Sequence, residues 1–176
     1  LGNPLLRERK LGFINSLPIR KWPLAGKDDF PGVSSSARSK SVTWYNYRAT
    51  QQTHEPDHAS DPGGASLWLS WTAPATGKAT VTTEGSSFDT LLGVYTGGAV
   101  NELTLVASND DHPSGGNTSR VEYDATAGTV YRIAVDGYMA DTGNIQFGIY
   151  DLVAANDLFA NRTVLTGFPT CTNGHN

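Results

Sequence analysis

Four acidic residues lie where the sequence predicts turns between strands, and together they could bind a metal ion. They are Glu55, Asp89, Asp110 and Asp111. Carboxylates from separate loops at one end of a β fold can supply several of the oxygen ligands that Ca²⁺ prefers. The alternative is that Asp89 and the run 109–111 only form hydrogen bonds within turns. The pattern predicts a calcium site on these four residues, with Asp57, Asp61 and Asp136 as weaker candidates.

Histidine and nucleophile patterns give weaker indications of chemistry. His54, His58 and His112 could approach the same acidic loops and bind zinc, but the His-x-x-x-His spacing falls in a loop that contains proline and not on a helix. For His58 we expect a hydrogen bond to the loop backbone instead. The sequence has no G-x-S-x-G or S-x-x-K motif, and its single cysteine, Cys171, can form neither an internal disulfide nor a thiolate cluster. We therefore expect no enzymatic activity.

Three aromatic residues are candidates for stacking against a ligand. Trp44, Trp68 and Tyr138 have rings with a flat apolar face and a polar edge, which suits sugars. Trp68 alternates with Leu67 and Leu69, so it lies on the opposite face of their strand. That face is covered either by a ligand or partner, in which case cell-surface glycans are candidates, or by the chain itself.

The elements that must position these residues are short strands. Hydrophobic residues make up 38% and charged residues 17% of the 176 residues, with 19 Gly and 9 Pro, which is typical of strands joined by tight turns. From Ser66 onward, apolar and polar residues alternate with a period of two. We expect an all-β fold, an antiparallel β-sandwich or jelly roll of about seven to nine strands. The alternating segments are 67–71, 79–83, 91–95, 103–107, 120–124, 131–135 and 145–149.

Charge and composition change along the chain and suggest three parts. Residues 1–40 hold 8 of the 13 Lys/Arg and 3 of the 17 acidic residues, so this part carries +5 and the remainder −9. We interpret 1–40 as an N-terminal arm or linker, 41–155 as the sandwich and 156–176 as a separate strand segment. The acidic remainder argues against a nucleic-acid partner, and no apolar run approaches the roughly 20 residues needed for membrane insertion. Few lysines and the sequons at Asn117 and Asn161 favour an extracellular or cell-surface location.

Several motifs in order resemble one known family. They are Glu55-Pro56-Asp57-His58-Ala59 and the runs 63–74, 85–97, 106–111 and 126–138. Over about residues 47–150 the chain resembles the bacterial pre-peptidase C-terminal-like (PPC-like) sandwich domains. This resemblance implies a secreted, non-catalytic jelly-roll module, often present in tandem repeats and appended to proteases or large surface proteins. It also favours calcium, because related sandwich modules often bind it.

The C-terminal segment resembles the opening of a repeat in that family. Such an opening looks like 156–161 followed by 164–167, whereas the N-terminal counterpart, 28–32, is only a faint copy. The resemblance implies either a permuted monomer or a module that donates its last strand to the next copy of itself, head to tail. Residues predicted to enter the acceptor are Leu158, Phe159, Val164, Leu165 and Phe168.

Two functions follow from these features. The first is a structural or adhesive subunit of an extracellular fibre, assembled by strand complementation and stabilised by Ca²⁺. The alternative is an accessory carbohydrate- or calcium-binding domain of a larger secreted hydrolase.

Strand donation predicts that removal of residues 156–176 abolishes assembly. The truncated protein should remain folded but monomeric, and a peptide of the tail sequence should bind to it, because the tail would fill an open edge of the sheet. Sedimentation velocity compares the two chains, and a truncated protein that assembles like the full chain contradicts the prediction.

Overall fold

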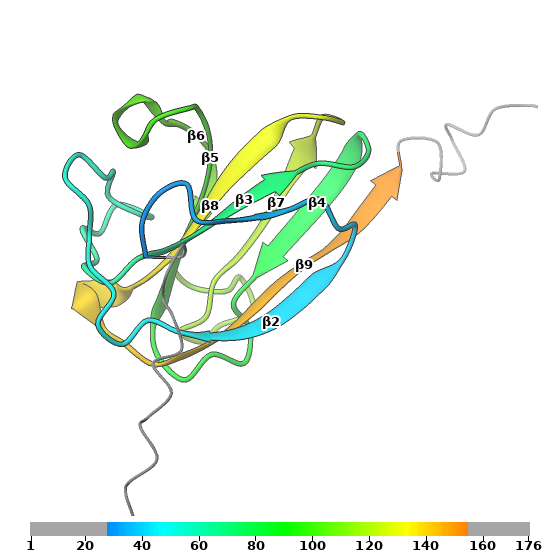
Figure 1. Ribbon diagram of the computed structural model, residues 1–176. Helices are drawn as coiled ribbons and strands as arrows, with labels where there is room; N and C mark the ends of the chain where they lie inside the picture. The colour runs from blue at the N-terminus through cyan, green and yellow to red at the C-terminus, as the bar shows by residue number, and fades with distance from the viewer. Residues whose placement is uncertain (1–27, 155–176) are drawn as a thin grey trace, which may run out of the picture.

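Two β-sheets pack face to face in a computed structural model that describes residues 28–154. The predicted all-β antiparallel sandwich is confirmed (Figure 1). The strands are β1 (Val33–Ser35), β2 (Lys40–Tyr45), β3 (Leu67–Thr72), β4 (Gly77–Thr82), β5 (Thr90–Thr96), β6 (Thr104–Asn109), β7 (Arg120–Ala125), β8 (Val130–Gly137) and β9 (Asn144–Ala154), with 3-10 turns η1 (Val100–Glu102) and η2 (Tyr138–Ala140).

The two sheets have the orders β1-β3-β8-β5-β6 and β2-β9-β4-β7. Neighbouring strands are antiparallel, except that β1 runs parallel to β3. Because consecutive strands often lie in different sheets, loops cross between the layers at both ends. Strands that follow one another in the chain run in opposite directions. The starts of β3, β5, β7 and β9 and the ends of β2, β4, β6 and β8 therefore lie at one end of the sandwich.

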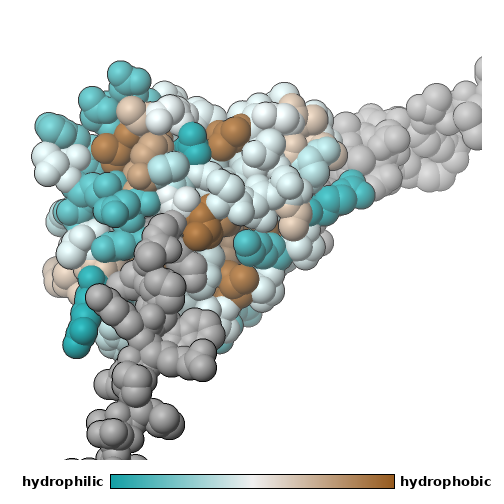
Figure 2. Space-filling view, viewed as in Figure 1, coloured by the Kyte–Doolittle hydropathy of each residue, from teal (hydrophilic) through white to brown (hydrophobic). Residues whose placement is uncertain are grey.

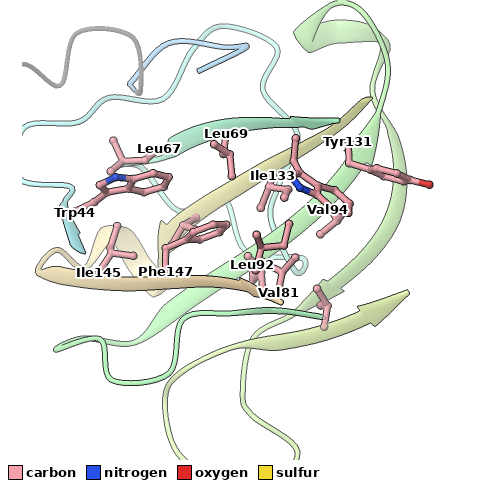
Figure 3. Close-up of a cluster of buried hydrophobic side chains, with 14 of the residues drawn as sticks. Trp44, Leu67, Leu69, Val81, Leu92, Val94, Tyr131, Ile133, Ile145 and Phe147 are labelled. Carbon is pink, nitrogen blue, oxygen red and sulfur yellow. The ribbon is translucent and has the colours of Figure 1, made fainter. Parts of the chain in front are cut away.

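Alternating residues from both sheets form the core between them. Leu67, Leu69 and Ile133 enter it from one sheet, and Ile145 and Phe147 enter it from the other (Figure 3). All five are essentially inaccessible to solvent. Burying a side chain of this size stabilises the fold by about 1.5–3 kcal/mol, so the period-two pattern fixes which face of each strand is internal.

The N-terminal boundary of the sandwich lies earlier than the sequence predicted. Residues 33–35 form β1 within the run 1–40 that we interpreted as an arm or linker, and β2 begins at Lys40. The Trp44 ring of β2 enters the core and stacks on Phe147, with 5.1 Å between ring centroids. The prediction that 1–40 is only an arm is therefore wrong for its last residues. β1 and β2 depend on pairing with β3 and β9, which local sequence does not reveal.

The chain's own β2 also supplies the outermost strand of the four-stranded sheet. Strand donation was expected because residues 156–176 resemble the opening of a repeat, and the pairing of β2 leaves that expectation untested. The proposed donor residues 156–176 lie outside the described residues, so their pairing stays a prediction.

The outer face of the five-stranded sheet carries a second, smaller apolar cluster. Trp68, Tyr95 and Ala134 are buried there, with Phe30 packed against them. The segment around Phe30 is held by Ser70, whose hydroxyl donates to the Pro31 carbonyl. The expectation that the chain itself covers Trp68 is confirmed.

Close approach of this covering segment requires glycine at position 32. Gly32 has φ +71°, and a Cβ there would lie 1.9 Å from the Trp68 carbonyl oxygen. A larger residue would both strain the backbone and displace the segment from the sheet.

The β6 edge departs from simple alternation. The sequence placed Leu103, Leu105 and Ala107 on one face, yet Leu105 is 55% exposed. The register with β5 shifts between Leu105 and Ala107, which leaves Val106 unpaired in a bulge. A bulge turns side chains away from strict alternation, so Leu105 and Val106 both reach the surface.

Replacing Trp44 by alanine should therefore destabilise the domain by about 3–5 kcal/mol, because it leaves a cavity against Phe147. The neighbouring substitution Tyr45→Ala is the matched control, since Tyr45 is 51% exposed, and we expect a change within about 0.5 kcal/mol. Chemical denaturation monitored by circular dichroism measures both. Equal effects of the two substitutions would show that β2 does not contribute to the core.

Candidate functional site

Three of the four predicted metal ligands come together at one end of the sandwich. Asp89 immediately precedes β5, and Asp110 and Asp111 immediately follow β6. Since β5 and β6 are antiparallel and Leu92 pairs with Asn109, the start of one strand meets the end of the other. One carboxylate oxygen from each aspartate lies within 4.8 Å of the other two.

The carboxylates of this aspartate group are poorly satisfied by the protein. Asp89 Oδ1 and Asp110 Oδ1 are buried and have no hydrogen-bond partner. Burial and repulsion by Asp110 and Asp111 raise the pKa of Asp89, and burial and repulsion by Asp111 raise that of Asp110. Buried, unpaired oxygens among like charges are what a bound cation would neutralise, so these residues fit a metal ion.

Glu55 does not join the aspartates, and this part of the prediction is wrong. Its Oε1 accepts hydrogen bonds from His58 Nε2 at 3.0 Å and Trp68 Nε1 at 3.1 Å, and its Oε2 accepts from the Gln52 N–H at 2.8 Å. The other His58 nitrogen, Nδ1, lies 2.8 Å from the Tyr95 hydroxyl. Glu55 thus ties the loop before β3 to the outer face of the five-stranded sheet.

The histidines take structural positions. The side chain of His58 bonds the side chains of Glu55 and Tyr95 and not the loop backbone, so that prediction is wrong. Its backbone forms an isolated bridge to Asp61. His112 Nδ1 accepts from the Ser114 N–H. Within residues 28–154, the aspartate group is the one set of three potential ligands that converges, so the alternative zinc site on His54, His58 and His112 does not form.

Asp136 has a structural role that the sequence did not predict. Its buried carboxylate accepts hydrogen bonds from the backbone N–H groups of Gly64, Ala65 and Gly137. Gly63 passes so close that a Cβ there would lie 2.0 Å from Asp136 Oδ2. The Gly63-Gly64 pair was the available signal, because paired glycines often allow backbone to wrap an anion.

The predicted ligand-stacking platform is not present as proposed. Trp44 and Trp68 are both buried, and a buried ring cannot stack on a ligand from solvent. Tyr138 is partly exposed in η2. The most exposed tyrosines of the described chain are instead Tyr45 and Tyr47.

Comparison with known proteins identifies the domain. Residues 65–137 match the model of the bacterial pre-peptidase C-terminal (PPC) domain family. The resemblance to the PPC domains is confirmed over this segment. The match begins just before β3 and ends with β8, so it includes Asp89, Asp110 and Asp111. The PPC domain is a non-catalytic accessory domain.

Two solved structures are similar to this chain. One is the pre-peptidase C-terminal domain of collagenase from Bacillus anthracis, with 9% identity, a TM-score of 0.44, and coverage of 66% of this chain and 92% of that one. The other is PliG of Aeromonas hydrophila, a periplasmic inhibitor of g-type lysozyme, with 16% identity, a TM-score of 0.44, and coverage of 67% and 93%. No curated protein matches the chain.

The Glu55 network predicts a pH dependence of stability. Burial alone would raise the pKa of Glu55, but hydrogen bonds from His58 and the Gln52 N–H, together with attraction to His58, hold it below its usual value. A carboxylate whose pKa is lower in the folded than in the unfolded protein stabilises the fold at pH values above its unfolded pKa, here about 4.3. This stabilisation is lost as the pH falls through the pKa of the folded state.

Glu55→Gln should therefore unfold more easily at pH 7, by about 1–3 kcal/mol, and the difference from the wild type should shrink as the pH falls from about 5 to 3. Denaturant titrations at several pH values measure it. The raised pKa values of Asp89 and Asp110 change stability with pH in the opposite direction. This contribution is the same in the wild type and in Glu55→Gln, so it cancels in the difference between them. Exposed Glu102→Gln is the control, and a pH-independent difference for Glu55→Gln would contradict the network's role.

Proposed function

We propose that this chain supplies a non-catalytic accessory module of a secreted protein, and that one Ca²⁺ ion stabilises its loop end. The observation that carries the calcium proposal is the pair of buried, unpartnered oxygens, Asp89 Oδ1 and Asp110 Oδ1, beside Asp111. Without a counter-ion, three carboxylates this close repel one another and destabilise the loops that hold them.

The donor chemistry favours Ca²⁺ over other metals. The group offers carboxylate oxygens and neither thiolate nor imidazole, which selects a hard cation over zinc. Ca²⁺ takes six to eight oxygen ligands in a flexible geometry, so Asp89, Asp110 and Asp111 could hold it together with water or backbone oxygens. Mg²⁺ demands a stricter octahedron, which loops from two different strand ends are less suited to supply.

An accessory role agrees with the placement of the polar side chains. The buried Glu55, His58 and Tyr95 side chains connect a covering loop to the sheet, where no substrate reaches them. PPC domains occur in secreted bacterial proteins. Among residues 28–154, no helix is long and apolar enough to span a membrane. These features support the accessory domain of a secreted hydrolase, the second of the two functions expected from the sequence.

A fibre subunit stays a prediction of the sequence. Its donor residues fall in 156–176, outside the described residues, and the described four-stranded sheet is completed by β2 of the same chain. A glycan partner is likewise still a prediction. Trp44 and Trp68 are no longer candidates for stacking against it, because both are buried.

Calcium should raise the melting temperature of the wild type. At 100 times its dissociation constant, the ion stabilises the fold by about 2.7 kcal/mol, or roughly 5–10 °C. Asp110→Asn should abolish this shift and, in chelator, should melt slightly higher than the wild type because it relieves repulsion. Asp124→Asn is the matched control, because Asp124 lies on β7 and its Oδ1 is 3.4 Å from Lys78 Nζ, outside the aspartate group. Equal wild-type melting temperatures with millimolar calcium and with chelator would exclude the site.

A further inference from the structure

The end of the sandwich that holds the aspartate group also exposes large apolar side chains. Tyr45, Tyr47 and Met139 are 51%, 54% and 74% exposed. The two tyrosines flank Asn46, whose side chain donates to the Asp141 carbonyl and accepts from the Gly143 N–H. Figure 1 shows η2, which contains Met139, beside the loop that follows β2.

Further aspartates surround these apolar groups. Asp61 Oδ1 accepts from the Met139 N–H at 3.2 Å, and the Tyr138 N–H donates to the Asp89 carbonyl at 3.0 Å. Asp61 and Asp141 both add to the repulsion felt by Asp89. We call this surface the acidic end; it comprises Tyr45, Tyr47, Met139, Asp61, Asp89, Asp110, Asp111 and Asp141.

The acidic end combines exposed apolar side chains with carboxylates. On the face shown in Figure 2, hydrophobic residues form small separate patches among polar ones. At the acidic end, three large apolar side chains lie among five carboxylates, and even with Arg48 beside Tyr47 the charges sum to −4. Such a surface suits a segment that is both basic and apolar.

The chain itself contains a segment of that chemistry. Residues 1–27 lie outside the described residues, and their sequence has six Lys/Arg and one Glu, a net charge of +5. Among these charges are apolar residues, including Leu11, Phe13, Ile14 and Trp22. The charge and the apolar content are complementary to those of the acidic end.

The described chain begins beside this surface. The Thr50 N–H donates to Asp28 Oδ1 at 2.7 Å, and Thr50 is three residues after Tyr47. Asp28, to which residues 1–27 are joined, therefore lies next to the acidic end. A short tether gives a linked segment an effective concentration in the millimolar range, so weak contacts suffice. We propose that residues 1–27 dock on the acidic end of their own domain, with their basic side chains against the aspartates and their apolar side chains against Tyr45, Tyr47 and Met139.

This docking does not rest on the calcium proposal and is tested in chelator. A zero-length carbodiimide reagent joins lysines to carboxylates that are in contact. We expect peptide mapping of the full chain, cross-linked at low concentration, to find Lys10 and Lys21 joined to Asp61, Asp110, Asp111 or Asp141. A cross-link from Lys27 is not informative, because Lys27 directly precedes Asp28 and lies near this surface whether or not residues 1–27 dock.

Salt and matched variants test whether the contact is specific. At 1 M salt the Debye length falls from about 8 to 3 Å, so we expect the yield of these cross-links to fall roughly fivefold. The pair Asp61→Asn and Asp141→Asn keeps the acceptor oxygens for backbone N–H groups and should at least halve the yield. Arg7→Gln with Arg9→Gln, outside the described domain, should lower the Lys10 yield without affecting folding. Asp124→Asn on β7 should change nothing.

Three outcomes would overturn the proposal. One is an absence of cross-links to the acidic end in a folded protein. Another is equal cross-linking to Asp124 or Glu122 on β7, which would mean non-specific attraction. The third comes from a mixture of ¹⁴N- and ¹⁵N-labelled chains, where links between light and heavy peptides would show that the occupant is the arm of a second copy. Links confined to single isotope classes, with no mixed links, support docking in cis.

Discussion

The requirement to bury both faces of β3 determines much of this structure. Leu67, Leu69 and Trp71 point into the core, while Trp68 points to the other side and is equally inaccessible. A second sheet covers the first face, as in any sandwich. The other face needs a cover of its own, and the chain uses the segment around Phe30 and the long connection between β2 and β3 to form it.

The covering connection is held by polar contacts whose loss would expose Trp68. Glu55 accepts a hydrogen bond from the Trp68 indole, and His58 bridges Glu55 to Tyr95 of β5. Asp136 fixes the last turn of the same connection through the N–H groups of Gly64 and Ala65. Buried polar groups that are this fully bonded specify one arrangement of a long loop.

The same connection brings negative charge to one end of the molecule. It carries Asp61 toward η2, where Asp89, Asp110 and Asp141 already lie. The structural carboxylates, Glu55 and Asp136, are satisfied by donors from the protein. Asp89 and Asp110 each retain a buried oxygen without a partner, and this difference in hydrogen bonding separates the candidate cation ligands from acids that only hold the fold.

The sequence alone determined the class of fold and most of the strands, because alternation in segments such as 131–135 and 145–149 is a local property with a period that only strands share. It also indicated the three acids that converge, among the four it predicted, since residues that adjoin the ends of consecutive antiparallel strands must meet. The tertiary structure decided what depends on long-range pairing: β1 and β2 as strands, the bulge that exposes Leu105, and the burial of Trp44. It also decided that Glu55 bonds Trp68 and His58 while Asp89 has an oxygen unbonded, because the partner of a carboxylate is set by which distant elements pack against it and not by its neighbours in the chain.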